Sequence, residues 1–357
     1  MPSSRIPLTL VALLLAGVDA LAQHCGGPCE VPRPAAPAVS PNPRFTLTEG
    51  EEKADWRYLH NYVWTEDGEP LYRLEETLSS PPLIFAQRRI FLSPAGNGFL
   101  VTGNPYLESG RTAADPSLFV FCRRDGEPLV RVSLRAALSD EELVPGPCPA
   151  GCGCEDVLYV FERDPVLSAN EAFVEVVAAG TGRVLSVFLP LGAPVEDRQA
   201  FELRLAALDW ARVPAVERDQ RGAEIDALVA ALDHADAGVR AEAEDGLVAA
   251  GYLALSALRS RGDEEPSEER TRRGRDLEAR LRPWADVGYE RMAIDLDLLT
   301  GLLADPEAPV VAAARSRLAE VLPEVEGQDW RAWIEERRGR LRWDPTQGRY
   351  LLEPRRP

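Results

Sequence analysis

One stretch, Glu224 to Gly251 (EIDALVAALDHADAGVRAEAEDGLVAAG), constrains the fold of this chain more than any other. In its first half the apolar residues recur at positions i, i+3, i+4 and i+7: Ile225, Leu228, Val229 and Leu232. This spacing places one apolar stripe on one face of an α-helix. The first half is therefore predicted to be an amphipathic helix that packs against a core.

The second half of the stretch predicts another helix after a tight turn. Asp236 lies just before the new apolar stripe, so its carboxylate is expected to accept hydrogen bonds from the free amides at the helix start. Val239, Ala243 and Leu247 then recur every four residues. Gly251 is expected to end the helix, since glycine tolerates positive φ. The whole stretch predicts two short antiparallel helices.

Together these residues resemble a HEAT-like (PBS-lyase-type) helical repeat, in which Leu-x-x-x-Leu precedes Asp-x-x-Val-Arg-x-x-Ala-x-x-x-Leu. The first copy comprises Leu228, Leu232, Asp236, Val239, Arg240, Ala243 and Leu247. A second comprises Leu299, Leu303, Asp305, Val310, Ala314 and Leu318, with Val311 in place of the arginine. A weaker copy runs through Asp263, Pro266, Glu269, Arg270 and Leu277. The resemblance covers about residues 221–323 and implies stacked helix pairs with a surface for protein recognition. An unrelated helical bundle would have the same core residues.

Composition shifts divide the chain into five segments. Residues 1–22 resemble a secretory signal, with an apolar core and a small-x-small cleavage site at 20–22. Residues 23–44 form a cysteine- and proline-rich tether, 45–195 a β-rich domain, 196–342 the helical repeat domain, and 343–357 a terminal hairpin and tail. The predicted fold class is therefore multidomain α+β. The protein is expected to be periplasmic or secreted and soluble after signal cleavage, with no transmembrane segment remaining.

The β-rich segment alternates apolar runs with turn dipeptides. The runs are Tyr58–Trp64, Arg89–Leu92, Phe99–Thr102, Leu118–Cys122, Leu129–Leu134, Val157–Phe161, Ala172–Ala178 and Val184–Leu189. Asp67-Gly68, Gly96-Asn97-Gly98, Asp125-Gly126 and Thr181-Gly182 lie between runs and are typical of hairpins. We expect a mostly antiparallel domain, as a sandwich or meander; a partial propeller is the alternative.

Six cysteines in an exported chain indicate disulfides, although the sequence does not choose among fifteen pairings. The candidates are Cys25, Cys29, Cys122, Cys148, Cys152 and Cys154. The alternative is a metal site built from Cys148, Cys152 and Cys154, with Cys122 or His60 as the fourth ligand. We predict no cofactor.

Charge and motifs exclude several function classes. The formal net charge is −18, which disfavours binding to a phosphate backbone, so no nucleic acid partner is expected. The sequence lacks a nucleophile elbow, a P-loop and a dinucleotide fingerprint, and no residue set predicts a catalytic site. The hypothesis is a non-enzymatic binding or scaffold protein that meets another exported protein through the repeat surface. The alternatives are a hydrolase-type enzyme with a site on the β-domain loops near Cys148–Asp156, and a structural envelope component.

Overall fold

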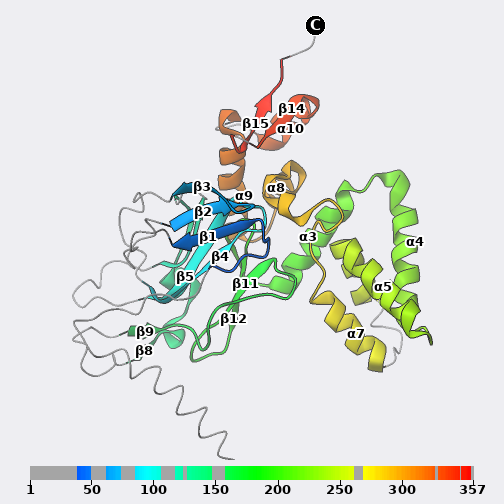
Figure 1. Ribbon diagram of the computed structural model, residues 1–357, viewed down its shortest axis with the longest axis horizontal. Helices are drawn as coiled ribbons and strands as arrows, with labels where there is room; N and C mark the ends of the chain where they lie inside the picture. Colours follow the sequence, from blue (N-terminus) through cyan, green and yellow to red (C-terminus); the bar gives the residue numbers. More distant parts are fainter. Residues whose placement is uncertain are drawn as a thin grey trace, which may run out of the picture.

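The computed structural model describes residues 38–49, 62–73, 85–105, 117–123, 127–146, 157–260, 268–325, 329–345 and 347–354. The N-terminal part consists of antiparallel β-sheets and the C-terminal part of helices, which confirms the α+β class (Figure 1). The predicted signal and residues 23–37 of the predicted tether lie outside the described residues. In the ranges above, no helix combines the length and the apolar character needed to cross a membrane.

Three antiparallel meander sheets make up most of the β-rich part. The first contains β1 (Phe45–Glu49), β2 (Tyr62–Glu66) and β3 (Glu69–Arg73). The second contains β4 (Phe85–Leu92), β5 (Gly98–Pro105), β6 (Ser117–Arg123) and β7 (Pro128–Ser133). The third contains β10 (Val166–Leu167), β11 (Phe173–Val177), β12 (Val184–Phe188) and β13 (Ala193–Val195). In each sheet the strands follow one another in chain order, so every neighbouring pair is joined directly.

Short elements link the second and third sheets. They are α2 (Leu134–Ala137), η1 (Asp140–Glu142), β8 (Val144–Gly146) and β9 (Val157–Tyr159), of which β8 and β9 form a separate two-stranded ladder. Glu142 anchors this linker, because its buried carboxylate accepts hydrogen bonds from the backbone of Ser139 and from Arg183 near β12. The hydrogen bond from Arg183, opposed by burial, lowers the pKa of Glu142 to about 2.

The three sheets stack face to face through the second one. Because side chains alternate along a strand, β5 directs Phe99 and Val101 to the first sheet and Leu100 to the third. Strand β6 follows the same rule, with Val120 on one side and Phe121 on the other. Both faces of the second sheet are therefore buried, which explains why its strands appear in the sequence as unbroken apolar runs.

The predicted strands and turns agree with the sheets. All eight apolar runs overlap strands of the structure. Asp67 and Gly68 both have positive φ and join β2 to β3, as a tight hairpin requires. Gly182 lies between β11 and β12, also with positive φ. The predicted turn at Asp125-Gly126 lies outside the described residues. Strands β1, β3, β8, β10 and β13 had no counterpart among the predicted runs.

Helices cover the outer face of the third sheet. The helical part contains α3 (Arg198–Arg212), α4 (Ala215–Ala231), α5 (Ala237–Ala250), η2 (Gly251–Ala254), α6 (Leu255–Ser260), α7 (Glu268–Glu278), η4 (Tyr289–Ile294), α8 (Leu296–Leu302), α9 (Ala308–Val321) and η5 (Pro323–Val325). Phe173 and Phe188 of the sheet pack against Phe201 of α3, with ring centroids 6.2 and 5.2 Å away. One apolar core then continues from this sheet through all the long helices. The expected domain boundary at 195/196 falls between β13 and α3, and the core crosses it.

The C-terminal elements pack against α8 and α9. Asp329 caps α10 (Trp330–Arg337) by accepting hydrogen bonds from the amides of Arg331 and Ala332. After η6 (Arg338–Arg340), β14 (Leu341–Asp344) and β15 (Arg349–Leu352) form the hairpin expected from Asp344-Pro345 and Gly348. The hairpin begins two residues earlier than the expected boundary at 343. It lies against α9, and the hydroxyl of Tyr350 donates to the carbonyl of Ile294 at 2.9 Å.

Candidate functional site

Most of the predicted cysteine site lies outside the described residues. This applies to Cys25, Cys29, Cys148, Cys152, Cys154 and His60, so neither the disulfides nor the metal alternative is tested. Cys122 is fully buried in β6, in the core between the first and second sheets. Within the described ranges, no group of three or more histidine, cysteine, aspartate or glutamate side chains could hold a metal ion.

The first predicted helix pair corresponds to α4 and α5. Leu232, Ala243 and Leu247 are buried between the helices, and Leu228 and Val239 are half-buried. Asp236 caps α5 as expected: its Oδ1 accepts from the amides of Gly238 at 2.6 Å and Val239 at 3.4 Å. Helix α4 begins at Ala215, about two turns before the predicted stretch, directly after Pro214.

Arg240 has a structural role in this pair. Its Nη1 donates to the carbonyls of His234 at 2.7 Å and Ala235 at 2.9 Å, in the turn between the two helices. The guanidinium thus satisfies two carbonyl groups of the turn itself, which follows the end of α4 at Ala231. The arginine of the sequence motif therefore stabilises the turn.

The second predicted pair corresponds to α8 and α9. Leu299, Val310, Ala314 and Leu318 are fully buried, and Leu303 is half-buried. Asp305 accepts from the amide of Glu307 at 2.9 Å, and its carboxylate also pairs with Arg204 of α3 at 2.7 Å. Arg204 further pairs with Glu307. The two copies of the motif therefore differ: Asp236 is exposed, whereas Asp305 links α9 to α3 through its ion pair with Arg204.

A buried polar cluster joins the third sheet to the helices. Asn170, in the turn between β10 and β11, donates to the hydroxyl of Tyr252 at 3.0 Å. That hydroxyl donates to Glu202 Oε1 at 3.0 Å. Glu202 also accepts from Arg198 at 3.0 Å and from Arg259 at 2.9 Å. Burial raises the pKa of Tyr252 well above its usual value, so its hydroxyl remains a donor. We call Asn170, Glu202, Tyr252, Arg198 and Arg259 the junction network.

A second buried carboxylate lies at the other end of α3. Asp209 accepts from the amide of Trp284 at 3.1 Å and pairs with Arg212, whose guanidinium lies 5.2 Å from the centroid of the Trp284 ring. Arg212 also pairs with Asp286. Desolvation raises the pKa of Asp209 to about 6, although the charge of Arg212 opposes this shift. Among the carboxylates that the structure describes, Asp209 is therefore the one whose pKa is raised towards neutral pH.

This raised pKa predicts a loss of stability as pH increases. The folded state holds the Asp209 proton more tightly than the unfolded chain, so the free energy of unfolding falls as pH rises from about 4 to about 6. The difference between a pKa of about 6 and the usual 3.8 corresponds to about 3 kcal/mol. Asp209→Asn removes the titration, so the stability difference between the two proteins must change across this window in urea titrations. Parallel pH curves would contradict the prediction. Glu142 has the opposite effect, because its pKa is lowered in the folded state. Its contribution to the free energy of unfolding is lost as pH falls from 4.5 towards 2.

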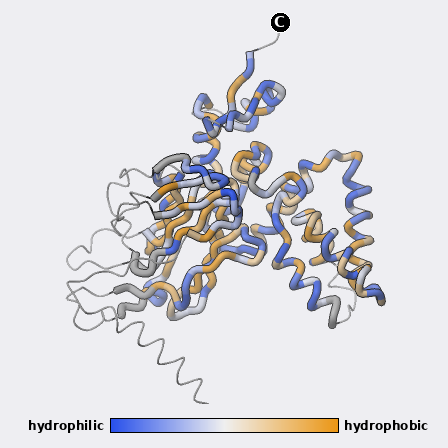
Figure 2. Tube along the Cα trace, viewed as in Figure 1, coloured by the Kyte–Doolittle hydropathy of each residue, from blue (hydrophilic) through white to orange (hydrophobic). Residues whose placement is uncertain are grey.

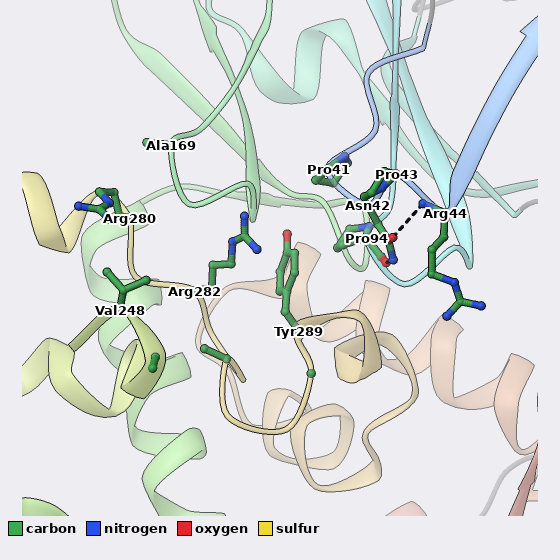
Figure 3. A pocket seen from close by; sticks show the side chains of 13 residues that line it. Pro41, Asn42, Pro43, Arg44, Pro94, Ala169, Val248, Arg280, Arg282 and Tyr289 are labelled. Atoms are coloured by element: carbon green, nitrogen blue, oxygen red, sulfur yellow. Dashed lines mark hydrogen bonds between the residues drawn. The ribbon is translucent and has the colours of Figure 1, made fainter. Parts of the chain in front are cut away.

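A cleft of about 680 Å³ lies between the sheets and the helices (Figure 3). Its sheet side is formed by Pro41, Asn42, Pro43, Arg44, Pro94 and Ala169, and its helical side includes Val248, Ala249, Arg280, Arg282, Ala285 and Tyr289. The Tyr289 ring is largely buried, and its hydroxyl donates to the carbonyl of Glu171. Burial raises the pKa of Tyr289 far above its usual value, so this group does not titrate near neutral pH.

Comparison with known proteins gives no match to any family model, curated protein or solved structure. The sites are therefore interpreted from their residues alone. Sequence reasoning missed both the junction network and the cleft, because their members come from segments far apart in the chain. One usable signal was present: Asn170, Glu202 and Tyr252 are polar residues that flank or interrupt apolar segments.

Proposed function

We propose that this chain is an exported, non-enzymatic binding or scaffold protein that recognises another exported protein through HEAT-like helix pairs. The contacts between helices support the interpretation that they form HEAT-like repeats. Helix α4 packs on α5, and α6 packs on α7; in addition, α4 contacts α6 and α5 contacts α7. First helices thus stack on first helices and second on second, as in a solenoid. The α8–α9 pair departs from this stack, since it contacts α3 and β13.

The observation that carries the proposal is the exposed start of α4. Residues 214–220 are all exposed, and Val216 is 90% exposed. The helix extends along the outer edge of the helical part, away from the sheets (Figure 1). Arg218 donates to the carbonyls of Ala211 and Val213, but most side chains of these first turns face solvent. Exposed turns gain little stability from propensity alone, so a partner that covers them would stabilise them. We define residues 215–224 as the α4 surface.

The shared core determines how the proposal is tested. A chain shortened near residue 200 would expose the apolar residues that the third sheet buries against the helices, and a binding defect would then have no clear meaning. Point changes on the α4 surface leave the core intact. Val216→Asp is suitable because Val216 has no buried contact to lose.

We expect the wild-type chain to retain a partner from an extracytoplasmic fraction and Val216→Asp to lose most of it. The minority of interface residues that dominate binding each contribute about 1 kcal/mol or more; with Val216 among them, retention should fall about fivefold or more. Val184→Asp is the matched control, because Val184 is an exposed valine on β12. Equal loss in both variants, or retention unchanged by Val216→Asp, would reject the α4 surface as the binding site.

A further inference from the structure

The cleft between sheets and helices has a charge opposite to that of the chain. The protein has 58 acidic residues against 40 lysines and arginines, yet three arginines and no acidic residue line the cleft. Arg44 lies at one end of the cleft, Arg280 at the other, and Arg282 between them (Figure 3). A positive lining within a strongly acidic chain indicates selection for a negatively charged ligand.

Two of these arginines are held in place by their own partners. Arg44 pairs with Glu66 at 2.8 Å and with Asp67 at 3.2 Å. Arg282 pairs with Glu171 and lies over the Tyr289 ring, 5.7 Å from its centroid. Both guanidinium groups remain about half exposed, so a ligand in the cleft can reach them.

Arg280 differs from the other two. Its side chain is exposed, and among the described contacts its guanidinium has no hydrogen bond and no ion pair. Val248 and Ala249 of α5 line the same part of the cleft. A guanidinium presents paired donors that match a carboxylate, and the neighbouring apolar side chains would cover the aliphatic part of the same ligand.

The opposite wall of the cleft is rigid. Asn42 accepts from the amide of Arg44 at 3.1 Å and donates to the carbonyl of Pro94 at 2.9 Å. Pro41, Pro43 and Pro94 fix their own φ angles in this wall. A wall that is already ordered loses little conformational entropy when a ligand binds.

We propose that this cleft binds a carboxylate-bearing, extended peptide segment. One carboxylate pairs with the guanidinium of Arg280, and the rest of the segment runs past Arg282 towards Arg44. The volume of about 680 Å³ exceeds what a single carboxylate or phosphate ion fills, which favours an elongated ligand. This site is separate from the α4 surface and does not depend on it.

The test uses the full chain and a fluorescent oligo-glutamate peptide, with binding followed by anisotropy. We expect binding that weakens with added salt, no binding of the amidated oligo-glutamine peptide, and a loss of about tenfold or more in Arg280→Glu. Arg280→Lys keeps the charge but not the paired donors, so it should bind with intermediate affinity. Arg315→Glu, at an exposed position of α9, is the matched control and should bind like wild type.

Three results would overturn the proposal. The first is no binding of oligo-glutamate by the wild-type chain. The second is an equal loss in Arg280→Glu and Arg315→Glu, which would indicate a general charge effect. The third is displacement of the peptide by inorganic phosphate at lower concentrations than by glutarate, which would assign the cleft to phosphate.

Discussion

Glu202→Ala is expected to lower the free energy of unfolding by about 2–3 kcal/mol. The side chain of Glu202 is only 8% exposed and accepts from Arg198, Arg259 and Tyr252. Its removal takes the acceptor from the buried Tyr252 hydroxyl at the junction between the third sheet and the helices. It also removes one carboxylate partner from each guanidinium, while Arg198 keeps Glu175 and Arg259 keeps Glu278. Urea titration followed by tryptophan fluorescence and by circular dichroism measures the change and shows whether unfolding stays cooperative.

Two further variants distinguish the loss of the junction network from the loss of side-chain volume. Glu202→Gln keeps one acceptor oxygen but not the charge, so its stability should lie between those of wild type and Glu202→Ala. Glu242→Ala removes an exposed carboxylate from α5 and should change stability by less than about 0.5 kcal/mol. If Glu202→Ala matched Glu242→Ala, the junction network would have no role in joining sheets and helices.

Gly251→Ala is the second substitution with a large expected effect. It should lower the free energy of unfolding by about 2–4 kcal/mol. Gly251 ends α5 at φ 59°, which L-residues rarely adopt. A Cβ there would lie 2.3 Å from the carbonyl oxygen of Arg282 and 2.6 Å from the Cβ of Ala285. Because the amide of Tyr252 bonds to the same carbonyl at 3.1 Å, the two segments cannot separate without losing that bond.

Gly274→Ala is the matched control for this substitution. Gly274 lies inside α7, and a Cβ there would meet no atom within 4 Å. Alanine should therefore raise the stability by about 0.5–1 kcal/mol, since it favours the helix. Opposite signs for the two glycine variants in thermal and urea unfolding are the expected result. A destabilised Gly274→Ala or a neutral Gly251→Ala would contradict the packing of η2 against residues 282–285.

Local pattern was sufficient to predict the longer elements of this protein, but not strands β1, β3, β8, β10 and β13. The i, i+3, i+4 spacing predicted α4, and the cap at Asp236 and the end at Gly251 were predicted from single residues because each acts on its own helix. The strands of the second sheet were also predictable, since burial on both faces leaves unbroken apolar runs. Two-residue strands such as β10 carry too few residues to show a period.

The sites depended on contacts that the sequence does not encode locally. Asn170, Glu202 and Tyr252 are brought together only when the β10–β11 turn packs on α3 and η2. The cleft likewise joins residues 41–44 to residues 280–289. Residues 215–220 contain one large apolar residue, Val216, so no periodic pattern marks where α4 begins. In Figure 2 much of α4 is coloured hydrophilic, whereas the strands carry longer hydrophobic stretches.

Hydrogen exchange of the full chain, with and without the captured partner, tests the central claim most directly. The claim is that the α4 surface contacts the partner. It predicts that binding slows exchange most strongly in residues 215–224, whose side chains pack against little in the free chain. Slower exchange confined to the three sheets, with the α4 surface unchanged, would contradict it and assign the partner to the β-rich part.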